Sequence, residues 1–153
     1  MAHTDSINQI KIFPNSNMAA SASDDNTVKV WDLTSTRLIQ TYTGHTNNVE
    51  CVEFLDANNI ASGSVDNTIQ IWQITSGTTK KTIKFSSWVT SLLLLPNGLL
   101  MSGDFTGSIK AWNATSGTMS YSLANSHKAA VNAMIVVNGT EIASGSDDYK
   151  GLK

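Results

Sequence analysis

One short phrase recurs along this chain, and the recurrence constrains the fold more than any other feature. The phrase is shared by four segments: ASASDDNTVKVWD (20–32), ASGSVDNTIQIWQ (61–73), MSGDFTGSIKAWN (101–113) and ASGSDDYKGLK (143–153). Trp31, Trp72 and Trp112 are separated by 41 and 40 residues. Self-similarity at a fixed period of about 20–50 residues is the signature of a repeat architecture. We therefore expect one structural unit repeated along the chain.

Each unit reads as short strands joined by turns, without helical periodicity. In the second unit the candidate strands are VECVEF (49–54), NIASGS (59–64), TIQIWQI (68–74) and TKKTIKF (79–85). They are rich in β-branched or aromatic residues, and Asn, Asp, Gly and Ser separate them. The same pattern places strands of the first unit at 6–13, 18–23, 27–32 and 37–42. We expect an all-β chain with almost no helix.

A histidine recurs at one place in these units, about 21 residues before an aspartate. The pairs at this spacing are His3 with Asp25, His45 with Asp66, and His127 with Asp148, and they include all three histidines of the chain. Each aspartate follows a strand that reads as buried, and an unpaired buried charge is costly. A histidine supplies a hydrogen-bond donor, so we predict that the members of each pair meet in the folded protein.

Four strands in about 40 residues, with Gly-His near the start and Trp-Asp near the end, resemble the WD-repeat (WD40) family. The resemblance covers residues 3–153 and implies a β-propeller, in which four-stranded antiparallel blades surround a central channel. The implied blades are residues 3–43, 44–85, 86–125 and 126–153, the last one partial. The third unit departs from the pattern, because Phe85 occupies the histidine position and Thr106 the aspartate position.

The resemblance also implies a buried hydrogen-bond network in each blade. In the second unit it runs from Asp66 through His45 and Ser62 to Trp72. A satisfied network of this kind rigidifies a structure and specifies one packing. The matching residues are His3, Ser21, Asp25 and Trp31 in the first unit, and His127, Ser144 and Asp148 in the fourth.

Ser, His and Asp also compose a hydrolase triad, so a catalytic interpretation competes with the structural one. Here the trio occurs three times at one spacing, and no nucleophile-elbow motif accompanies it. Asp24-Asp25 and Asp147-Asp148 resemble metal ligands, but no further ligand is clustered at a suitable spacing. We expect a protein that is not an enzyme and that holds no metal and no cofactor.

Charge and composition argue against several other classes of partner. The formal net charge is −2 and the ten Lys and Arg residues are scattered, which argues against nucleic acid or an anionic membrane surface as a partner. The longest apolar run, LLLLP (92–96), is too short to span a bilayer, and the N-terminus lacks the pattern of a signal peptide. The single cysteine, Cys51, excludes an internal disulfide and fits a reducing compartment. We expect an intracellular protein, in the cytoplasm or the nucleus.

The resemblance implies that a protein or peptide partner binds one face of the blades. Two positions of each blade dominate that face: the residue before the first apolar residue of the inner strand, and the residue before the turn aspartate. These pairs are Ser6 and Asp24, Asn48 and Val65, Trp88 and Phe105, and Ala130 and Asp147. The two aromatic rings either anchor a partner or pack internally in place of the missing network. We favour binding for Trp88 and packing for Phe105.

We therefore expect a non-catalytic scaffold or recognition module within a larger protein or complex. The alternatives are a self-completing homo-oligomeric propeller, a propeller enzyme and a nucleic-acid binder. Propellers close with about four to eight blades, and an open array exposes apolar flanks. Either a longer propeller supplies the remaining blades, or a second copy does. We favour the longer propeller, because nothing in the last residues looks adapted to pairing.

Overall fold

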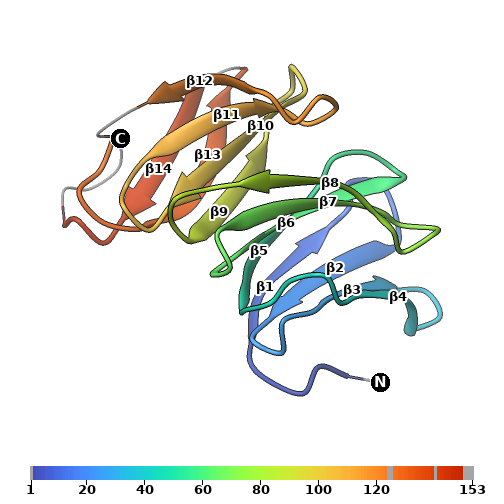
Figure 1. The fold of residues 1–153 in the computed structure, drawn as a ribbon. Helices are drawn as coiled ribbons and strands as arrows, with labels where there is room; N and C mark the ends of the chain where they lie inside the picture. Colours follow the sequence, from blue (N-terminus) through green and yellow to red (C-terminus); the bar gives the residue numbers. More distant parts are fainter. Residues whose placement is uncertain (1, 124–125, 140, 150–153) are drawn as a thin grey trace.

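A computed structural model describes residues 2–123, 126–139 and 141–149 of the chain (Figure 1). The described residues form fourteen strands and contain no helix. The strands make four antiparallel sheets that follow one another in an open arc, with the two termini at opposite ends (Figure 1). The expectation of an all-β chain built from propeller blades is confirmed, and the arc is not closed.

Three sheets have four strands each, in sequence order, and we call them blades 1, 2 and 3. Blade 1 contains β1 (Ile7–Ile12), β2 (Met18–Ser23), β3 (Val28–Asp32) and β4 (Arg37–Tyr42). Blade 2 contains β5 (Val49–Phe54), β6 (Asn59–Ser64), β7 (Thr68–Gln73) and β8 (Thr79–Lys84). Blade 3 contains β9 (Val89–Leu94), β10 (Leu99–Asp104), β11 (Ile109–Asn113) and β12 (Met119–Leu123). Blade 4 contains β13 (Val131–Asn138) and β14 (Glu141–Ser146), while residues 140 and 150–153 of the fourth repeat lie outside the described residues.

The turn after the second strand of each blade needs one residue in the left-handed backbone region. In blades 1 and 2 this residue is Asn26 (φ 66°) and Asn67 (φ 65°), each directly after the turn aspartate. Asparagine tolerates this conformation better than most side chains do. Blade 3 uses Gly107 (φ 91°) at the same place. The turn that carries each aspartate therefore has one backbone shape in these three blades.

Hydrophobic residues between consecutive blades form the core. Each sheet has a forward face, which packs on the next blade, and a rear face, which packs on the previous one. Between blades 1 and 2, for example, Val28 and Val30 belong to the same buried cluster as Val52, Ile60 and Trp72. A corresponding cluster lies between blades 2 and 3, and another between blades 3 and 4. Burial of these faces against their neighbours supplies the main stabilisation.

A glycine on each of two forward faces lets the next blade approach closely. A Cβ atom added to Gly63 would lie 2.5 Å from Cγ1 of Val89, the first residue of blade 3. One added to Gly103 would lie 2.7 Å from Cβ of Val131, the first residue of blade 4. The branched side chain of each valine thus packs directly on the backbone of the glycine. We call this contact the valine seat.

The valine seat predicts that Gly63→Ala destabilises the protein although alanine is small and apolar. The new methyl group would overlap Val89, so the two blades would have to separate, at a cost of about 1–3 kcal/mol. Urea unfolding followed by tryptophan fluorescence measures this cost. The control is Thr82→Ala, at an exposed position of β8, where a change within about 0.5 kcal/mol is expected. Equal stability of the two variants would contradict the seat.

Candidate functional site

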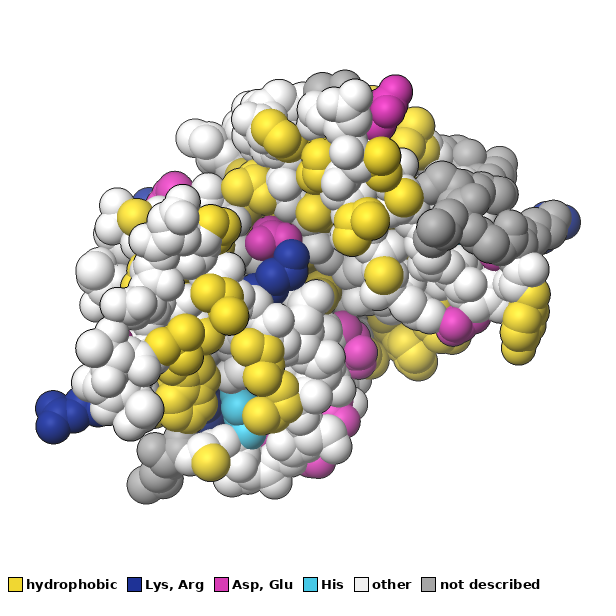
Figure 2. Space-filling view, turned by 180° about the vertical axis from the view of Figure 1, so that it is seen from behind, with side chains coloured by type: hydrophobic (Ala, Val, Ile, Leu, Met, Phe, Trp, Pro, Cys, Tyr) yellow, Lys and Arg dark blue, Asp and Glu magenta, His cyan; other side chains and the backbone are white. Residues whose placement is uncertain are grey.

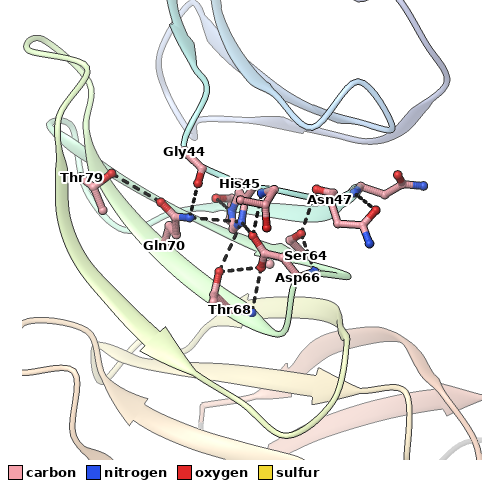
Figure 3. Close-up of polar contacts among 12 residues, drawn as sticks. Gly44, His45, Asn47, Ser64, Asp66, Thr68, Gln70 and Thr79 are labelled. Carbon is pink, nitrogen blue, oxygen red and sulfur yellow. Dashed lines mark hydrogen bonds and ion pairs between the residues drawn. The ribbon is translucent and has the colours of Figure 1, made fainter.

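The predicted network of blade 2 is assembled around Asp66 in the turn between β6 and β7 (Figure 3). Asp66 Oδ2 lies 2.8 Å from His45 Nδ1, and His45 Nε2 lies 2.7 Å from Ser62 Oγ. The indole N–H of Trp72 donates to the same Ser62 oxygen at 2.8 Å. These four side chains form one continuous chain from the turn to the third strand, in the order expected from the sequence. We call this arrangement the clamp.

The donors and acceptors of the clamp are all satisfied when His45 is neutral. The imidazole N–H at Nδ1 then donates to Asp66, and the Ser62 hydroxyl donates to Nε2. Burial lowers the pKa of His45 below its usual 6.5, although the neighbouring Asp66 opposes this shift. Burial alone would raise the pKa of Asp66, but hydrogen bonds from Thr68, His45 and the Thr46 amide outweigh it and lower the pKa. The folded protein therefore holds a neutral imidazole beside a carboxylate.

The clamp also ties the loop before β5 to the turn after β6. The Thr46 amide donates to Asp66 Oδ2 at 3.1 Å, and the Ser64 hydroxyl donates to the Asn47 carbonyl oxygen at 3.0 Å. On the other side, the side-chain amide of Gln70 donates to the carbonyl oxygen of Gly44 at 2.9 Å (Figure 3). Loop and turn are thereby fixed to each other at the edge of the blade. This edge is where the candidate binding residues lie.

Blade 1 repeats the clamp of blade 2, and blade 4 repeats its histidine half. In blade 1, His3 lies 2.8 Å from Asp25 and 2.7 Å from Ser21, which also accepts from Trp31 at 2.9 Å. In blade 4, the distances from His127 are 3.1 Å to Asp148 and 2.8 Å to Ser144. All the residues predicted for these two networks are brought together in this way.

Blade 3 has a different clamp, which the sequence patterns did not predict. Its carboxylate is Asp104, two residues before the usual position, at the place that Ser64 has in blade 2. Asp104 is 1% exposed, accepts from Thr106 Oγ1 at 2.6 Å and forms an ion pair with Lys110 at 3.0 Å. Hydrogen bonds from Thr106, Lys110 and Ser108 overcome the effect of burial and lower the pKa of Asp104. The available signal was an aspartate where the other units have serine, together with a lysine six residues later.

The two aromatic residues of the blade 3 clamp pack on each other. Phe85, at the histidine position, lies with its ring centroid 4.9 Å from that of Trp112. The Lys110 ammonium lies 4.9 Å from the Phe85 centroid, in cation–π geometry. The Trp112 indole still donates to Ser102 at 2.8 Å, as in the other blades. A ring and a lysine thus take the place that the imidazole has in the other blades.

The predicted face pairs are neighbours in all four blades, because the second residue of each pair donates its backbone N–H to the carbonyl oxygen of the first. The donor–acceptor distances are 2.9 Å for Asp24 to Ser6, 3.0 Å for Val65 to Asn48, 3.0 Å for Phe105 to Trp88 and 3.2 Å for Asp147 to Ala130. The blades follow one another in the arc, so the four pairs form a row along one face. We call this row the pair face.

The rings of Trp88 and Phe105 contact each other at a tilt of 48°, at the surface of the pair face. Their ring centroids are 4.5 Å apart, and the side chains are 43% and 50% exposed. Internal packing of Phe105 is therefore a wrong expectation, because Phe85 and Lys110 already fill the interior of that blade. The other non-acidic members of the row are smaller, and Ala130 is buried at 6% exposure. The aromatic pair is the largest apolar feature of the pair face.

Two carboxylates lie on the pair face on either side of the aromatic pair. Asp24 accepts a hydrogen bond from the side-chain amide of Asn8 at 2.7 Å, and Asp147 accepts one from the side-chain amide of Asn132 at 2.6 Å. Glu50, on the inner strand of blade 2, has a raised pKa because burial and the charge of Asp24 both disfavour its ionised form. The pair face therefore combines an apolar centre with acidic flanks.

No group of three or more His, Cys, Asp or Glu that could hold a metal ion occurs in the part of the chain that the structure describes. Within those same residues, no helix is long and apolar enough to cross a membrane.

Comparison with known proteins identifies the repeats. The family model for the "WD domain, G-beta repeat" (WD40) matches residues 1–32 and 36–73. Residues 1–73 carry WD40 repeats. The solved WD40 β-propeller domain of Doa1 is 25% identical and superposes with a TM-score of 0.85, over 96% of this chain and 50% of that one. The computationally designed Ika4 protein is 27% identical with a TM-score of 0.85, over 99% and 91% of the two chains. Over its whole length, the open arc therefore has the fold of WD40 propeller blades.

Fungal proteins are among the curated relatives with similar sequence. The probable E3 ubiquitin ligase complex SCF subunit sconB of Arthroderma otae is 46% identical over 50 residues, which are 33% of this chain and 7% of the relative. The probable SCF subunit scon-2 of Neurospora crassa is 42% identical over 53 residues, 35% of this chain and 8% of the relative. The chain spans less than a tenth of the length of these relatives in the match.

The lowered pKa values of His45 and Asp66 predict that acid weakens the WD40 clamp. As the pH falls below 6.5, the usual pKa of histidine, His45 takes up a proton in the unfolded protein before it does so in the folded protein. The unfolded state is thereby favoured, and stability is lost as the pH falls through the lower pKa of the folded residue. Asp66 adds a second loss below its usual 3.8. Urea unfolding at about pH 7.5 and about pH 5.5 tests the histidine part. His45→Gln should lose less unfolding free energy between these two pH values than the parent, and an equal loss would contradict the neutral imidazole.

The replacement clamp of blade 3 predicts that Lys110→Met is destabilising. It leaves the buried carboxylate of Asp104 without its cation, at a cost of about 1–3 kcal/mol. Chemical denaturation measures the change. Lys84→Met, at an exposed position of β8, removes the same charge and should stay within about 0.5 kcal/mol of the parent. If the two lysine variants were equally stable, the ion pair would not be part of a clamp.

Proposed function

We propose that this chain is a non-catalytic recognition module that binds a protein or peptide partner on the pair face. The observation that carries the proposal is the exposed contact between the rings of Trp88 and Phe105, held on a rigid blade. Large aromatic side chains dominate the binding energy of many interfaces. When a partner covers two such side chains that lie side by side, the binding free energy becomes more favourable.

The aromatic pair is preorganised for binding. The Phe105 amide donates to the Trp88 carbonyl oxygen at 3.0 Å, and the rings contact each other. Asp104 fixes the turn that carries Phe105, because its carboxylate accepts hydrogen bonds from the backbone N–H groups of Thr106 and Ser108. Little conformational entropy remains to be lost when a partner covers the rings, and this favours affinity.

The acidic flanks set the chemistry of the partner. Along the row, Asp24 lies two blades before the aromatic pair and Asp147 one blade after it, so an anionic partner would be repelled at both ends. An extended peptide with an apolar or aromatic anchor and Lys or Arg residues beside it matches the row. Nucleic acid does not match it, which agrees with the scattered cations of the chain.

The burial of the clamp serines favours binding over catalysis. Ser21, Ser62 and Ser144 are at most 3% exposed, and the Ser62 oxygen already accepts a hydrogen bond from Trp72. A nucleophilic serine has to reach its substrate, so these hydroxyls are badly placed for a hydrolase.

The comparisons and the single cysteine support a module inside a larger assembly within the cell. The fungal relatives are named as subunits of an SCF E3 ubiquitin ligase complex, and the match to them lies in the repeats. We extend to this chain only the idea of a subunit that recognises another protein. Cys51 is buried and its pKa is raised by burial, which suits a packed thiol in the cytoplasm or nucleus.

Selection from a phage-displayed random peptide library tests the proposed function. Peptides that bind the chain should carry an apolar or aromatic anchor next to Lys or Arg. Trp88→Ala should weaken their binding at least about tenfold, or about 1.4 kcal/mol, while thermal unfolding stays close to that of the parent. Isothermal titration calorimetry and a melting curve on the same variant separate the two effects.

Tyr121→Ala is the matched control for that experiment. Tyr121 is as exposed as Trp88, at 43%, but lies on the outer strand β12, away from the pair face. It should leave peptide binding unchanged. Loss of binding only in proportion to a lower melting temperature, or equal effects of the two variants, would remove Trp88 from the binding site.

A further inference from the structure

The rear face of blade 1 is exposed, although the same face is covered in every later blade. On β1, Ile7, Ile10 and Ile12 are 52%, 62% and 62% exposed. The residues at the same places on β5 are at most 3% exposed, because blade 1 covers them: Val49, Val52 and Phe54. Figure 2 shows hydrophobic side chains gathered over the N-terminal blade, at the lower left of that view. This face has the composition of a blade interface, and none of the described blades of the same chain packs on it.

The forward face of blade 4 contains an apolar groove over Gly145. The groove is lined by Ala133, Met134, Ile135, Ala143 and Gly145. Gly145 occupies the position of Gly63 and Gly103 in the two preceding blades. There, the first valine of the next blade fills the valine seat. A Cβ added to Gly145 meets nothing within 4 Å among the described residues, so the seat of blade 4 is open.

Ile7 of blade 1 has the shape and position of the residue that fills such a seat. It is the first residue of an inner strand, as Val89 and Val131 are, and it is β-branched like them. Those two valines are buried in their seats at 0% exposure, whereas Ile7 is half exposed. The open seat and the unseated residue lie at opposite ends of the arc (Figure 1). One chain therefore carries both halves of an interface that it cannot close with itself.

A hydrogen bond within blade 4 repeats one within blade 1, where the same asparagine also reaches blade 2. The Asn8 amide of blade 1 donates to Asp24 at 2.7 Å and to the backbone oxygen of Val49, in blade 2, at 3.0 Å. Asn132 of blade 4 donates to Asp147 at 2.6 Å in the same way. Blade 2 has Glu50 at this place, and blade 3 has Thr90, whose hydroxyl donates to the backbone oxygen of Val131, in blade 4, at 2.8 Å.

The side chain at this place indicates how an incoming blade would be bound on the forward face of blade 4, because Asn8 and Thr90 both donate to the first backbone oxygen of the next inner strand. Asn8 reaches the first residue of the next inner strand, so Asn132 is set to reach the corresponding carbonyl oxygen of an incoming blade. Ile7 is the residue of this chain at that position, and it already matches the open seat. The inner two strands of blade 4 thus offer a seat and an amide donor to an incoming blade, and blade 1 offers a rear face of the kind that such strands bind. The described part of blade 4 has no counterparts of Val28, Val30 and Tyr42, which complete the forward side of blade 1.

We propose that two copies of this chain join head to tail, with the forward face of blade 4 of each copy packed on the rear face of blade 1 of the other. Ile7 of one copy fills the seat over Gly145 of its partner. Heterologous contacts of this kind give closed rings when the rotation allows it. In their described residues, two copies supply six four-stranded blades and two two-stranded ones, which corresponds to the upper end of the propeller range of about four to eight blades. The proposal goes beyond the proposed binding function and does not rest on it.

Sedimentation velocity over a concentration series tests the pairing. The parent chain should sediment as a dimer. Gly145→Val places a branched side chain in the seat, with open space around it inside its own copy, and should give a folded monomer. Ile7→Asp introduces a charge on the exposed rear face of blade 1 and should do the same. Circular dichroism and a melting curve establish that each variant is folded.

Mixing the two monomeric variants distinguishes head-to-tail contact from any other pairing. Ile7→Asp copies keep an intact blade 4, and Gly145→Val copies keep an intact blade 1. The mixture can form one intact interface and should sediment as a dimer, which neither variant forms alone. If each face bound the same face of the other copy instead, mixing the two variants would not restore the dimer.

Phe105→Asp is the matched control. Phe105 is as exposed as Ile7, at 50%, but lies on the pair face rather than on either end of the arc. This variant should remain a dimer even though it disrupts the proposed peptide site. A failure of the pairing proposal can therefore be told apart from a failure of the proposed binding function. A parent chain that is monomeric or polydisperse at every concentration would overturn the pairing and point to blades from another source. A dimer that survives both Ile7→Asp and Gly145→Val would overturn it as well.

Discussion

The structure depends on keeping one carboxylate charged and hydrogen-bonded at the edge of each blade. Asp66 is held by His45, Thr68 and the Thr46 amide, and their combined effect exceeds the cost of its partial burial. Removing any one donor would leave a desolvated oxygen without a partner. Because the donors come from the preceding loop and from the following strand, satisfying this charge also orients both segments. The position of the pair face is a consequence of that constraint.

Blade 3 satisfies the same constraint with different residues. Its carboxylate moves to Asp104, and the lost imidazole is replaced by the Lys110 ammonium lying against the Phe85 ring. The requirement is therefore for a cationic or N–H donor beside a buried acid, rather than for histidine itself. This explains how a blade without the His–Asp pair keeps the same strands, the same turn conformation and the same tryptophan–serine bond.

Sequence reasoning reached the blades and the repeated clamp because both depend on local patterns. The strand alternation, the turn asparagines and the His–Asp spacing are all visible within one repeat, and they place strands within about a residue or two of the observed bounds. The blade 3 clamp was missed because Lys110 and Asp104 acquire their meaning only when Phe85 is packed between strands. Internal packing of Phe105 was wrongly expected, since the sequence does not reveal that the interior was already filled. The open seat at Gly145 likewise depends on atoms of another blade, which a single repeat cannot display.

The aromatic pair lies in the blade whose carboxylate has shifted. In blades 1 and 4 the residue before the turn aspartate is itself acidic, Asp24 and Asp147, and each is held by an asparagine. In blade 3 the charge has moved down into the strand, where Lys110 neutralises it. The turn position above is then free of a neighbouring carboxylate, and Phe105 can lie against Trp88 without a charge competing for the same surface. The uncharged centre of the pair face thus extends from Val65 of blade 2, where the clamp is unaltered, to the aromatic pair of blade 3, while Asp24 and Asp147 supply its acidic ends.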